Sequence, residues 1–389
     1  MKLLSPAILV LAAALIFSAE GAPSAPKQIL FEGLMGIPVR LPDGTLLTLA
    51  AQGRPLKEMA NDGPAQPVFA RSSHDDGQTW SAPVQVFAYP AGRGSVTQLI
   101  YPLVDKDGHL HAFGLRYFRL PSKENRGAGE CQMLHNVSRD GGKTWSPARP
   151  VNFGHAYTGA INSIIQLSSG RLLGALSYAS DNFLDNVGQI EFRSLSFYSD
   201  DDGETWKMGT DNIRVPFGPQ ITHPGAIEPI LMEMRDRRVW MIIRTQTLRF
   251  WEIFSRDGGQ TWTSPVASRF MAPDSPGAIH RLKDGRLVLV WNDIMSYPNG
   301  VTGHYRQYLY AALSGDDGKT WTKPQRVGPL DQADKEKSRG DYPYLCETTS
   351  GKLLLTYYRF GLGEKASYEY PYLELVRIDP DWLAASRHP

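Results

Sequence analysis

The octapeptide Ser73-His-Asp-Asp-Gly-Gln-Thr-Trp80 is the first of five copies of one pattern, Ser-x-Asp-x-Gly-x-Thr-Trp. The aspartates of successive copies are separated by 56 to 65 residues. A repeat of that length, with β-type sequence between the copies, predicts four-stranded units that close radially into a propeller. The other copies are residues 138–145, 199–206, 255–262 and 314–321.

Each octapeptide contains the residues of a self-contained turn. Asp and Ser side chains accept bonds from nearby backbone amides, Gly adopts φ > 0, and Thr bonds back across the turn. Tryptophan is too large to remain exposed in every copy, so we expect it to wedge between neighbouring sheets. Because catalysis needs one site rather than five, we interpret the repeated aspartates as structural.

A second repeat gives the number of blades. Short turns such as Lys106-Asp-Gly-His-Leu110 and Ser168-Ser-Gly-Arg-Leu172 precede an apolar strand six times. The sixth unit has no octapeptide, and an early strand at Gln28-Ile-Leu-Phe31 has no unit. Pairing these two closes the ring and removes an exposed sheet edge. We therefore predict an all-β, six-bladed propeller with five octapeptide hairpins, formed as one domain by residues 22–389.

Composition restricts the partners of the chain. The 389 residues carry a formal net charge of +1, which gives no support for nucleic acid or an anionic membrane as partner. The chain has no His/Cys/Asp cluster with zinc-ligand spacing and no phosphate-binding glycine loop. We therefore predict no metal and no cofactor.

The N-terminus reads as a secretory signal. Lys2 precedes a mostly apolar run over residues 3–17, and Ala19-Glu-Gly21 supplies small residues at the spacing of a cleavage site. We expect a signal peptide at 1–21, no membrane span after its removal, and a secreted or periplasmic protein; a retained anchor is the alternative. The two cysteines, Cys131 and Cys346, leave a disulfide possible but not required.

The octapeptides and the segments between them resemble the sialidase (neuraminidase) superfamily, the six-bladed Asp-box propellers, over nearly all of the expected mature chain. Asp-box turns also occur in propellers without catalytic activity, so the resemblance has to be examined position by position. It implies an exported exo-glycosidase that removes terminal acidic sugars, sialic acid or a related sugar, from a glycan or oligosaccharide. It also implies a retaining mechanism that uses a tyrosine, a glutamate and an aspartate.

The strongest match is Gly225-Ala-Ile-Glu-Pro-Ile230, which is followed sixteen residues after Glu228 by Arg244. In the family this Glu takes the proton from the tyrosine nucleophile, and the arginine holds the substrate carboxylate. A Glu inside an apolar strand is costly unless it lines a polar cavity, which independently favours a functional role. A salt-bridged strand pair is the structural alternative.

Three further positions resemble the family's site. Arg306 stands eight residues before Ser314, in the place of another carboxylate-binding arginine. Tyr342 falls where the nucleophilic tyrosine is expected, with Tyr344 as the alternative register. Asp62 lies eleven residues before Ser73 and matches the acid/base aspartate.

One position departs from the family. Sialidases open the first blade with Arg-Ile-Pro, and here that segment is Gly36-Ile37-Pro38, so the first arginine of the triad is absent. Arg54 or Arg40 is then a candidate to reach the carboxylate instead. The departure keeps two other functions open: a lyase or hydrolase of uronic-acid polysaccharide, and a glycan-binding propeller without catalysis.

Overall fold

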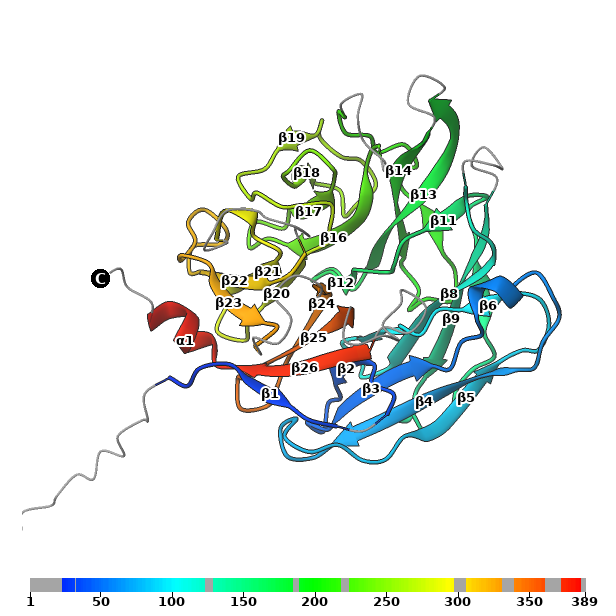
Figure 1. Cartoon of the computed structure of the whole chain (residues 1–389), viewed down its shortest axis with the longest axis horizontal. Coiled ribbons are helices and arrows are strands. Elements are labelled where there is room, and N and C mark those ends of the chain that lie inside the picture. Colours follow the sequence, from blue (N-terminus) through cyan, green and yellow to red (C-terminus); the bar gives the residue numbers. More distant parts are fainter. Residues whose placement is uncertain are drawn as a thin grey trace, which may run out of the picture.

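The chain forms six antiparallel sheets arranged around one axis in the computed structural model, which confirms the predicted six-bladed propeller (Figure 1). The structure describes residues 23–31, 33–122, 129–184, 189–217, 224–296, 306–330, 339–360 and 372–385. The expected signal peptide lies outside these residues. Within them, no helix is long and apolar enough to cross a membrane.

The sheets follow the chain in order, one blade after another. Blade one contains β2 (Ile37–Arg40), β3 (Leu46–Ala51), β4 (Gln66–Ser73) and β5 (Val84–Tyr89). Blade two contains β6 (Ser95–Val96), β7 (Tyr101–Val104), β8 (Leu110–Arg119), β9 (Glu130–Ser138) and β10 (Arg149–Val151). Blade three contains β11 (Ala156–Thr158), β12 (Ile164–Gln166), β13 (Leu172–Leu184), β14 (Gln189–Ser199) and β15 (Lys207–Met208).

The second half of the ring repeats this order. Blade four contains β16 (Ile227–Glu233), β17 (Val239–Arg244), β18 (Trp251–Ser255) and β19 (Val266–Ala267). Blade five contains β20 (Ala278–Arg281), β21 (Leu287–Trp291), β22 (Leu309–Ser314) and β23 (Gln325–Gly328). Blade six contains β24 (Arg339–Glu347), β25 (Leu353–Phe360), β26 (Tyr372–Ile378) and the N-terminal β1 (Lys27–Ile29). The helical segments are η1 (Leu56–Glu58), η2 (Ile294–Ser296) and α1 (Pro380–Ala385).

The N-terminal strand closes the ring as predicted. β1 pairs antiparallel with β26, with Gln28 opposite Val376, and forms the outer strand of blade six (Figure 1). The last blade is therefore built from both ends of the chain. This pairing gives the exposed edge of β26 a partner.

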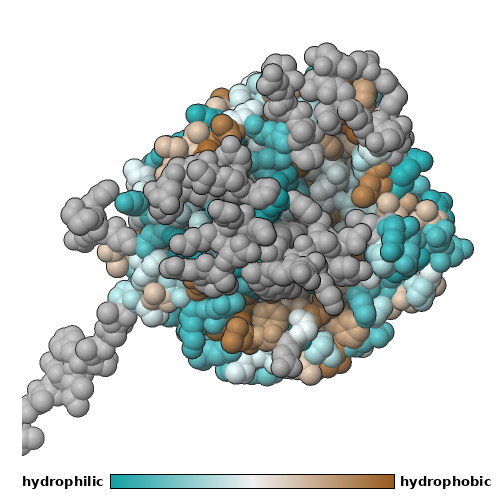
Figure 2. Space-filling view, viewed as in Figure 1, coloured by the Kyte–Doolittle hydropathy of each residue, from teal (hydrophilic) through white to brown (hydrophobic). Residues whose placement is uncertain are grey.

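Each octapeptide is the self-contained turn that its residues predict. In the second copy, Asp140 accepts bonds from the backbone N–H of Thr144 at 2.9 Å and from its hydroxyl at 2.6 Å. Trp145 lies against Phe87 of the neighbouring blade, with ring centroids 4.8 Å apart. The turns join the two outermost strands of blades one to five. They therefore lie at the outside of the ring. Figure 2 shows hydrophilic residues interspersed with hydrophobic ones along the rim of the molecule.

The hydrophobic core is divided among the blade interfaces. One buried cluster, for example, combines Leu49 and Val68 of blade one with Leu110 and Leu134 of blade two. Five further clusters join the other neighbouring pairs around the ring. Because each hydrophobic cluster lies between two neighbouring blades, a chain of this length needs no single enlarged core.

Strand register separates two edges of the propeller. In blade four, Ile227 at the start of β16 is opposite Arg244 at the end of β17, whereas Val239 at the other end of β17 is opposite Ser255, the first residue of an octapeptide. We call the first edge the Glu228 edge and the second the octapeptide edge. Any group at the start of an innermost strand therefore lies at the Glu228 edge.

A buried histidine pair in blade two predicts sensitivity to acid. His111 Nδ1 and His135 Nε2 lie 3.0 Å apart, and His111 Nε2 lies 3.2 Å from a carboxylate oxygen of Asp105. Burial, with the neighbouring His111 second, lowers the pKa of His135 to about 3. His135 is then neutral in the folded protein, while the unfolded chain takes up a proton below a pH of about 6.5.

The free energy of unfolding is therefore expected to fall as the pH drops from about 6.5 towards 3, by about 1.4 kcal/mol per pH unit from His135 alone. His135→Gln keeps a polar group near the position of Nε2 and does not titrate, so its stability should depend less on pH. Urea unfolding across this pH range measures the difference, with the exposed His74→Gln as control. Equal pH dependence in wild type and His135→Gln would contradict the assignment.

Candidate active site

Glu228 is held in an unusual backbone conformation at the start of β16. Its φ is 45°, and the register of β16 against β17 shifts between Ile227 and Ile230. A left-handed residue at a bulge turns its side chain out of the regular strand direction, and such strain is typical of functional sites. The backbone N–H of Glu228 donates to Ser177 Oγ at 3.2 Å, and Glu228 Oε1 accepts from the N–H of Ala160 at 3.1 Å.

Tyr342 repeats this arrangement in blade six. Its φ is 54°, and the register of β24 shifts between Asp341 and Tyr344. The Tyr342 hydroxyl donates to Glu228 Oε1 at 2.9 Å, although 114 residues separate the two. Both innermost strands, β16 and β24, thus have a positive φ and a register shift at the functional residue. These distortions accompany the contact between the Tyr342 hydroxyl and the Glu228 carboxylate.

The electrostatics of this pair suit a proton transfer. Burial, followed by the Glu228 carboxylate, raises the pKa of Tyr342. The phenol is therefore protonated at neutral pH and needs a base before it can attack as a nucleophile. Glu228 lies within hydrogen-bond reach of that proton, which is the first requirement for a general base.

Arg244 completes the contact. Its Nη1 donates to Glu228 Oε2 and lies 3.3 Å from the Tyr342 hydroxyl oxygen. A buried carboxylate of this kind needs a charged partner, and the guanidinium supplies it. Glu228, Arg244 and Tyr342, predicted from three separate segments, therefore form one cluster.

Arg306 reaches the same cluster through carboxylates. Its Nη1 donates to Asp341 at 3.0 Å, and its Nη2 lies 3.8 Å from Asp274. Asp274 also accepts from Arg244 Nε at 2.7 Å. Asp274 therefore joins the two arginines that the sequence assigned to substrate binding.

Asp62 lies on the loop between β3 and β4. Ala51 at the end of β3 is opposite Val68 near the start of β4, and Ile37 at the start of β2 is opposite Leu49. The loop therefore leaves blade one at the Glu228 edge. The Asp62 side chain is exposed to solvent.

Arg54 bonds to backbone carbonyl groups around the Asp62 loop. Its guanidinium donates to the carbonyl oxygens of Glu58 at 2.9 Å, Asn61 at 3.1 Å and Gly92 at 3.3 Å. These bonds brace the loop that carries Asp62. The bonds engage Nη1 and Nη2 of Arg54 with the backbone of its own loop, and its role as a carboxylate ligand stays a prediction.

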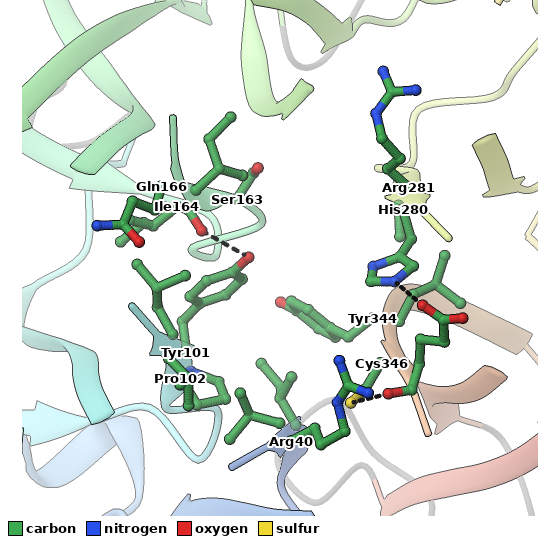
Figure 3. Close-up of a pocket in the computed structure, with 18 of the residues that line it drawn as sticks. Arg40, Tyr101, Pro102, Ser163, Ile164, Gln166, His280, Arg281, Tyr344 and Cys346 are labelled. Atoms are coloured by element: carbon green, nitrogen blue, oxygen red, sulfur yellow. Dashed lines mark hydrogen bonds and ion pairs between the residues drawn. The ribbon is translucent and has the colours of Figure 1, made fainter. Parts of the chain in front are cut away.

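Arg40 lies at the wrong edge to replace the missing arginine. It is opposite Leu46, which in turn is opposite Ser73 at the octapeptide edge. Arg40 lines an axial cavity of about 580 Å³ that is formed by the innermost strands of all six blades. Figure 3 shows this cavity with Tyr101 and Tyr344 projecting into it from opposite sides.

Tyr344 belongs to that cavity and not to the Glu228 cluster. Its hydroxyl donates to the carbonyl oxygen of Ile161 at 3.2 Å, and the hydroxyl of Tyr101 donates to the carbonyl oxygen of Ile164 at 3.3 Å (Figure 3). Of the two tyrosines considered from the sequence, Tyr342 is the one that contacts Glu228.

The two cysteines, Cys131 and Cys346, are both buried and do not form a disulfide.

Gly36 cannot be exchanged for the family's arginine. A Cβ atom at this position would lie 2.1 Å from the backbone oxygen and 2.8 Å from the backbone nitrogen of Leu49. Any side chain would therefore force β3 away from the start of β2. The glycine that distinguishes this chain from the family is therefore required by the close contact between β2 and β3 in blade one.

Sequence reasoning missed three contributors to the cluster, Asp274, Asp341 and Gly159. Asp341 lies in the innermost strand β24, and Asp274 lies shortly before the innermost strand β20. Glu228 has a similar place in blade four, and this shared place in the repeat is the signal that identifies the two aspartates. Gly159 has no such signal: a Cβ there would lie 2.5 Å from Glu228 Oε1, so the glycine makes room for the carboxylate.

Comparison with known proteins identifies the family of the chain. Residues 68–373 match the family of BNR repeat-like domains, and the chain belongs to that family. A sialidase from Micromonospora viridifaciens is 27% identical over 318 residues, which are 72% of this chain and 44% of that protein. The chain therefore spans less than half the length of this relative.

Solved structures share the fold. A protein of unknown function from Dyadobacter fermentans gives a TM-score of 0.65 at 18% identity and covers 92% of this chain and 98% of its own. The K499G mutant of the NanB sialidase from Streptococcus pneumoniae gives a TM-score of 0.61 at 14% identity, and the match covers 91% of this chain and 70% of the NanB chain. Together these relatives confirm the predicted membership of the sialidase and BNR-repeat superfamily.

Proposed function

We propose that the protein is an exported, retaining exo-glycosidase that acts on a terminal acidic sugar, sialic acid or a related one. The observation that carries the proposal is the 2.9 Å hydrogen bond from Tyr342 to Glu228 beside Arg244. A neutral phenol suits a sugar whose anomeric carbon carries a carboxylate, because a charged nucleophile would be repelled. The family relationship supports the same chemistry.

The reaction has two steps in this proposal. Tyr342 Oη attacks the anomeric carbon as its proton passes to Glu228, while the bond to the leaving oxygen breaks and Asp62 protonates that oxygen. Water then attacks the same carbon, Asp62 accepts the proton of the water, and the tyrosyl oxygen leaves and recovers its proton from Glu228. Two displacements at one carbon retain its configuration.

A screen of the purified mature protein on fluorogenic sialosides, uronides and neutral glycosides tests the proposal. Hydrolysis of at least one acidic glycoside is expected. An ultraviolet-absorbing unsaturated product would instead identify a lyase. Absence of turnover on every acidic glycan would leave only glycan binding. N-terminal sequencing of the native protein tests export, since a mature chain should begin near Ala22.

Uronic-acid glycans are a second candidate class. Gly36 favours them, because the clash with Leu49 excludes a third arginine at that position. A uronic acid carries its carboxylate away from the anomeric carbon. Its binding therefore does not require three arginines around the anomeric carboxylate. The uronides in the screen separate this class from sialosides.

Asp62 is expected to act mainly on leaving groups that need protonation. Asp62→Ala should lower turnover of natural oligosaccharides by about a hundredfold or more, and turnover of aryl glycosides with acidic phenols far less. Steady-state kinetics on the two substrate types measures the ratio. The exposed Asp107→Ala is the control. A loss of the same size on both substrate types would mean that Asp62 is not the proton donor.

A further inference from the structure

Asp274 occupies a position between the two arginines of the site. It lies in the turn Pro273-Asp-Ser-Pro276, directly before the innermost strand of blade five. One carboxylate oxygen accepts from Arg244 Nε at 2.7 Å, and the other lies 3.8 Å from Arg306 Nη2. Gln246 Nε2 donates to that second oxygen at 2.8 Å.

Each of the two guanidinium groups also bonds to a second carboxyl group. Arg244 Nη1 bonds to Glu228, and Arg306 Nη1 bonds to Asp341. Two cations therefore face three carboxyl groups. A carboxylate ligand would bring a fourth acidic group into a largely buried cluster, which is unfavourable unless one of the three moves away.

Of the three, Asp274 is the group that a ligand can displace. The side chains of Glu228 and Asp341 are 0% exposed, whereas that of Asp274 is 19% exposed. Asp274 also bridges both arginines, which is the position in which a ligand carboxylate would receive charge-assisted bonds from the pair. Gly36 provides no compensating cation, because its backbone lies against Leu49.

We propose that Asp274 is an internal competitor for the arginine pair and a specificity-determining residue of the site. A sugar with a carboxylate on its anomeric carbon binds only by displacing Asp274 from Arg244 and Arg306. Sugars that leave the bridge intact, including those with an acid group elsewhere on the ring, are preferred. The inference rests on the proposed function, since it assumes that the reacting sugar binds beside Tyr342.

Isothermal titration calorimetry of the mature protein tests the competition without any need for turnover. The probes are N-acetylneuraminic acid and its methyl ester, which differs by one methyl group and carries no charge. Asp274→Ala is expected to bind the acid at least about tenfold more tightly than wild type and to bind the ester equally well. Asp274→Asn, which keeps the volume of the side chain, should change the affinity in the same direction.

Asp317→Ala is the matched control. Asp317 is 16% exposed and pairs with Arg281 at 2.7 Å at the octapeptide edge, so its loss makes the same change in net charge far from Glu228. This variant should bind both probes as wild type does. Thermal melting of each variant confirms that the proteins compared are folded.

Weaker or unchanged binding of the acid by Asp274→Ala would overturn the inference and make Asp274 a residue that positions the arginines. Failure of all the proteins to bind the acid would also overturn it, because the arginine pair would then not be a carboxylate site. Failure of the glycosidase proposal has a different signature. In that case no glycoside is turned over, and the affinity difference between the variants persists.

Discussion

Tyr342→Phe is expected to lower turnover by about a thousandfold or more on whichever glycoside the wild-type protein hydrolyses best. The substitution removes one oxygen atom, the one that donates to Glu228 at 2.9 Å. The ring keeps its edge contact with Tyr358, whose centroid lies 5.9 Å away. The loss should therefore appear in kcat, with little change in substrate affinity or in the melting temperature.

Tyr344→Phe is the matched control for this measurement. It removes the same atom from a neighbouring tyrosine of the same strand, whose hydroxyl bonds to a backbone carbonyl beside the axial cavity. Its kcat should stay within a few-fold of wild type. A wild-type rate for Tyr342→Phe, or a larger loss for Tyr344→Phe, would remove Tyr342 from the role of nucleophile.

Gly36→Ala is expected to destabilise the protein by about 3 kcal/mol or more. The added methyl would lie 2.1 Å from the carbonyl oxygen of Leu49, so β3 has to move away from its partner strand. The affected atoms belong to the backbone and cannot relax by a change of rotamer. Restoring the family's arginine at position 36 meets the same obstacle, so that substitution does not test carboxylate recognition.

Gly315→Ala provides the comparison. A Cβ at Gly315 meets nothing within 4 Å, and its backbone is not left-handed. The free energy of unfolding of Gly315→Ala should stay within about 0.5 kcal/mol of the wild-type value. Denaturant unfolding of the two variants measures both values. Equal stabilities for Gly36→Ala and Gly315→Ala would show that β2 and β3 tolerate a side chain at position 36.

The sequence predicts the fold well because the fold is repetitive. Each octapeptide satisfies its own hydrogen bonds, as Asp140 and Thr144 do, so its structure depends little on the rest of the chain. The closing strand β1 is also predictable. The early strand needs a partner, and the last blade lacks its outermost strand, so pairing the two satisfies both. Radial closure then brings Glu228 and Tyr342 together from blades four and six.

The finer features of the site depend on contacts that no local pattern contains. Arg54, for example, bonds to the carbonyl oxygens of Glu58 and Asn61, and no local pattern predicts these bonds because loop conformation decides where the guanidinium lies. Asp274 lies in an ordinary proline-flanked turn, and only the assembled ring places it on Arg244. Ion pairs between residues of different blades, such as that of Asp274 with Arg244, can therefore be identified only from the structure.

The most direct test of the proposed mechanism is mass spectrometry of the protein trapped in mid-reaction. A fluorinated analogue of the best substrate, carrying a good leaving group, slows the second step and should accumulate the glycosyl enzyme. A single adduct is expected on the peptide that contains Tyr342, and none is expected in Tyr342→Phe. An adduct on another residue, or turnover of the analogue with no adduct at any time, would contradict the proposed mechanism.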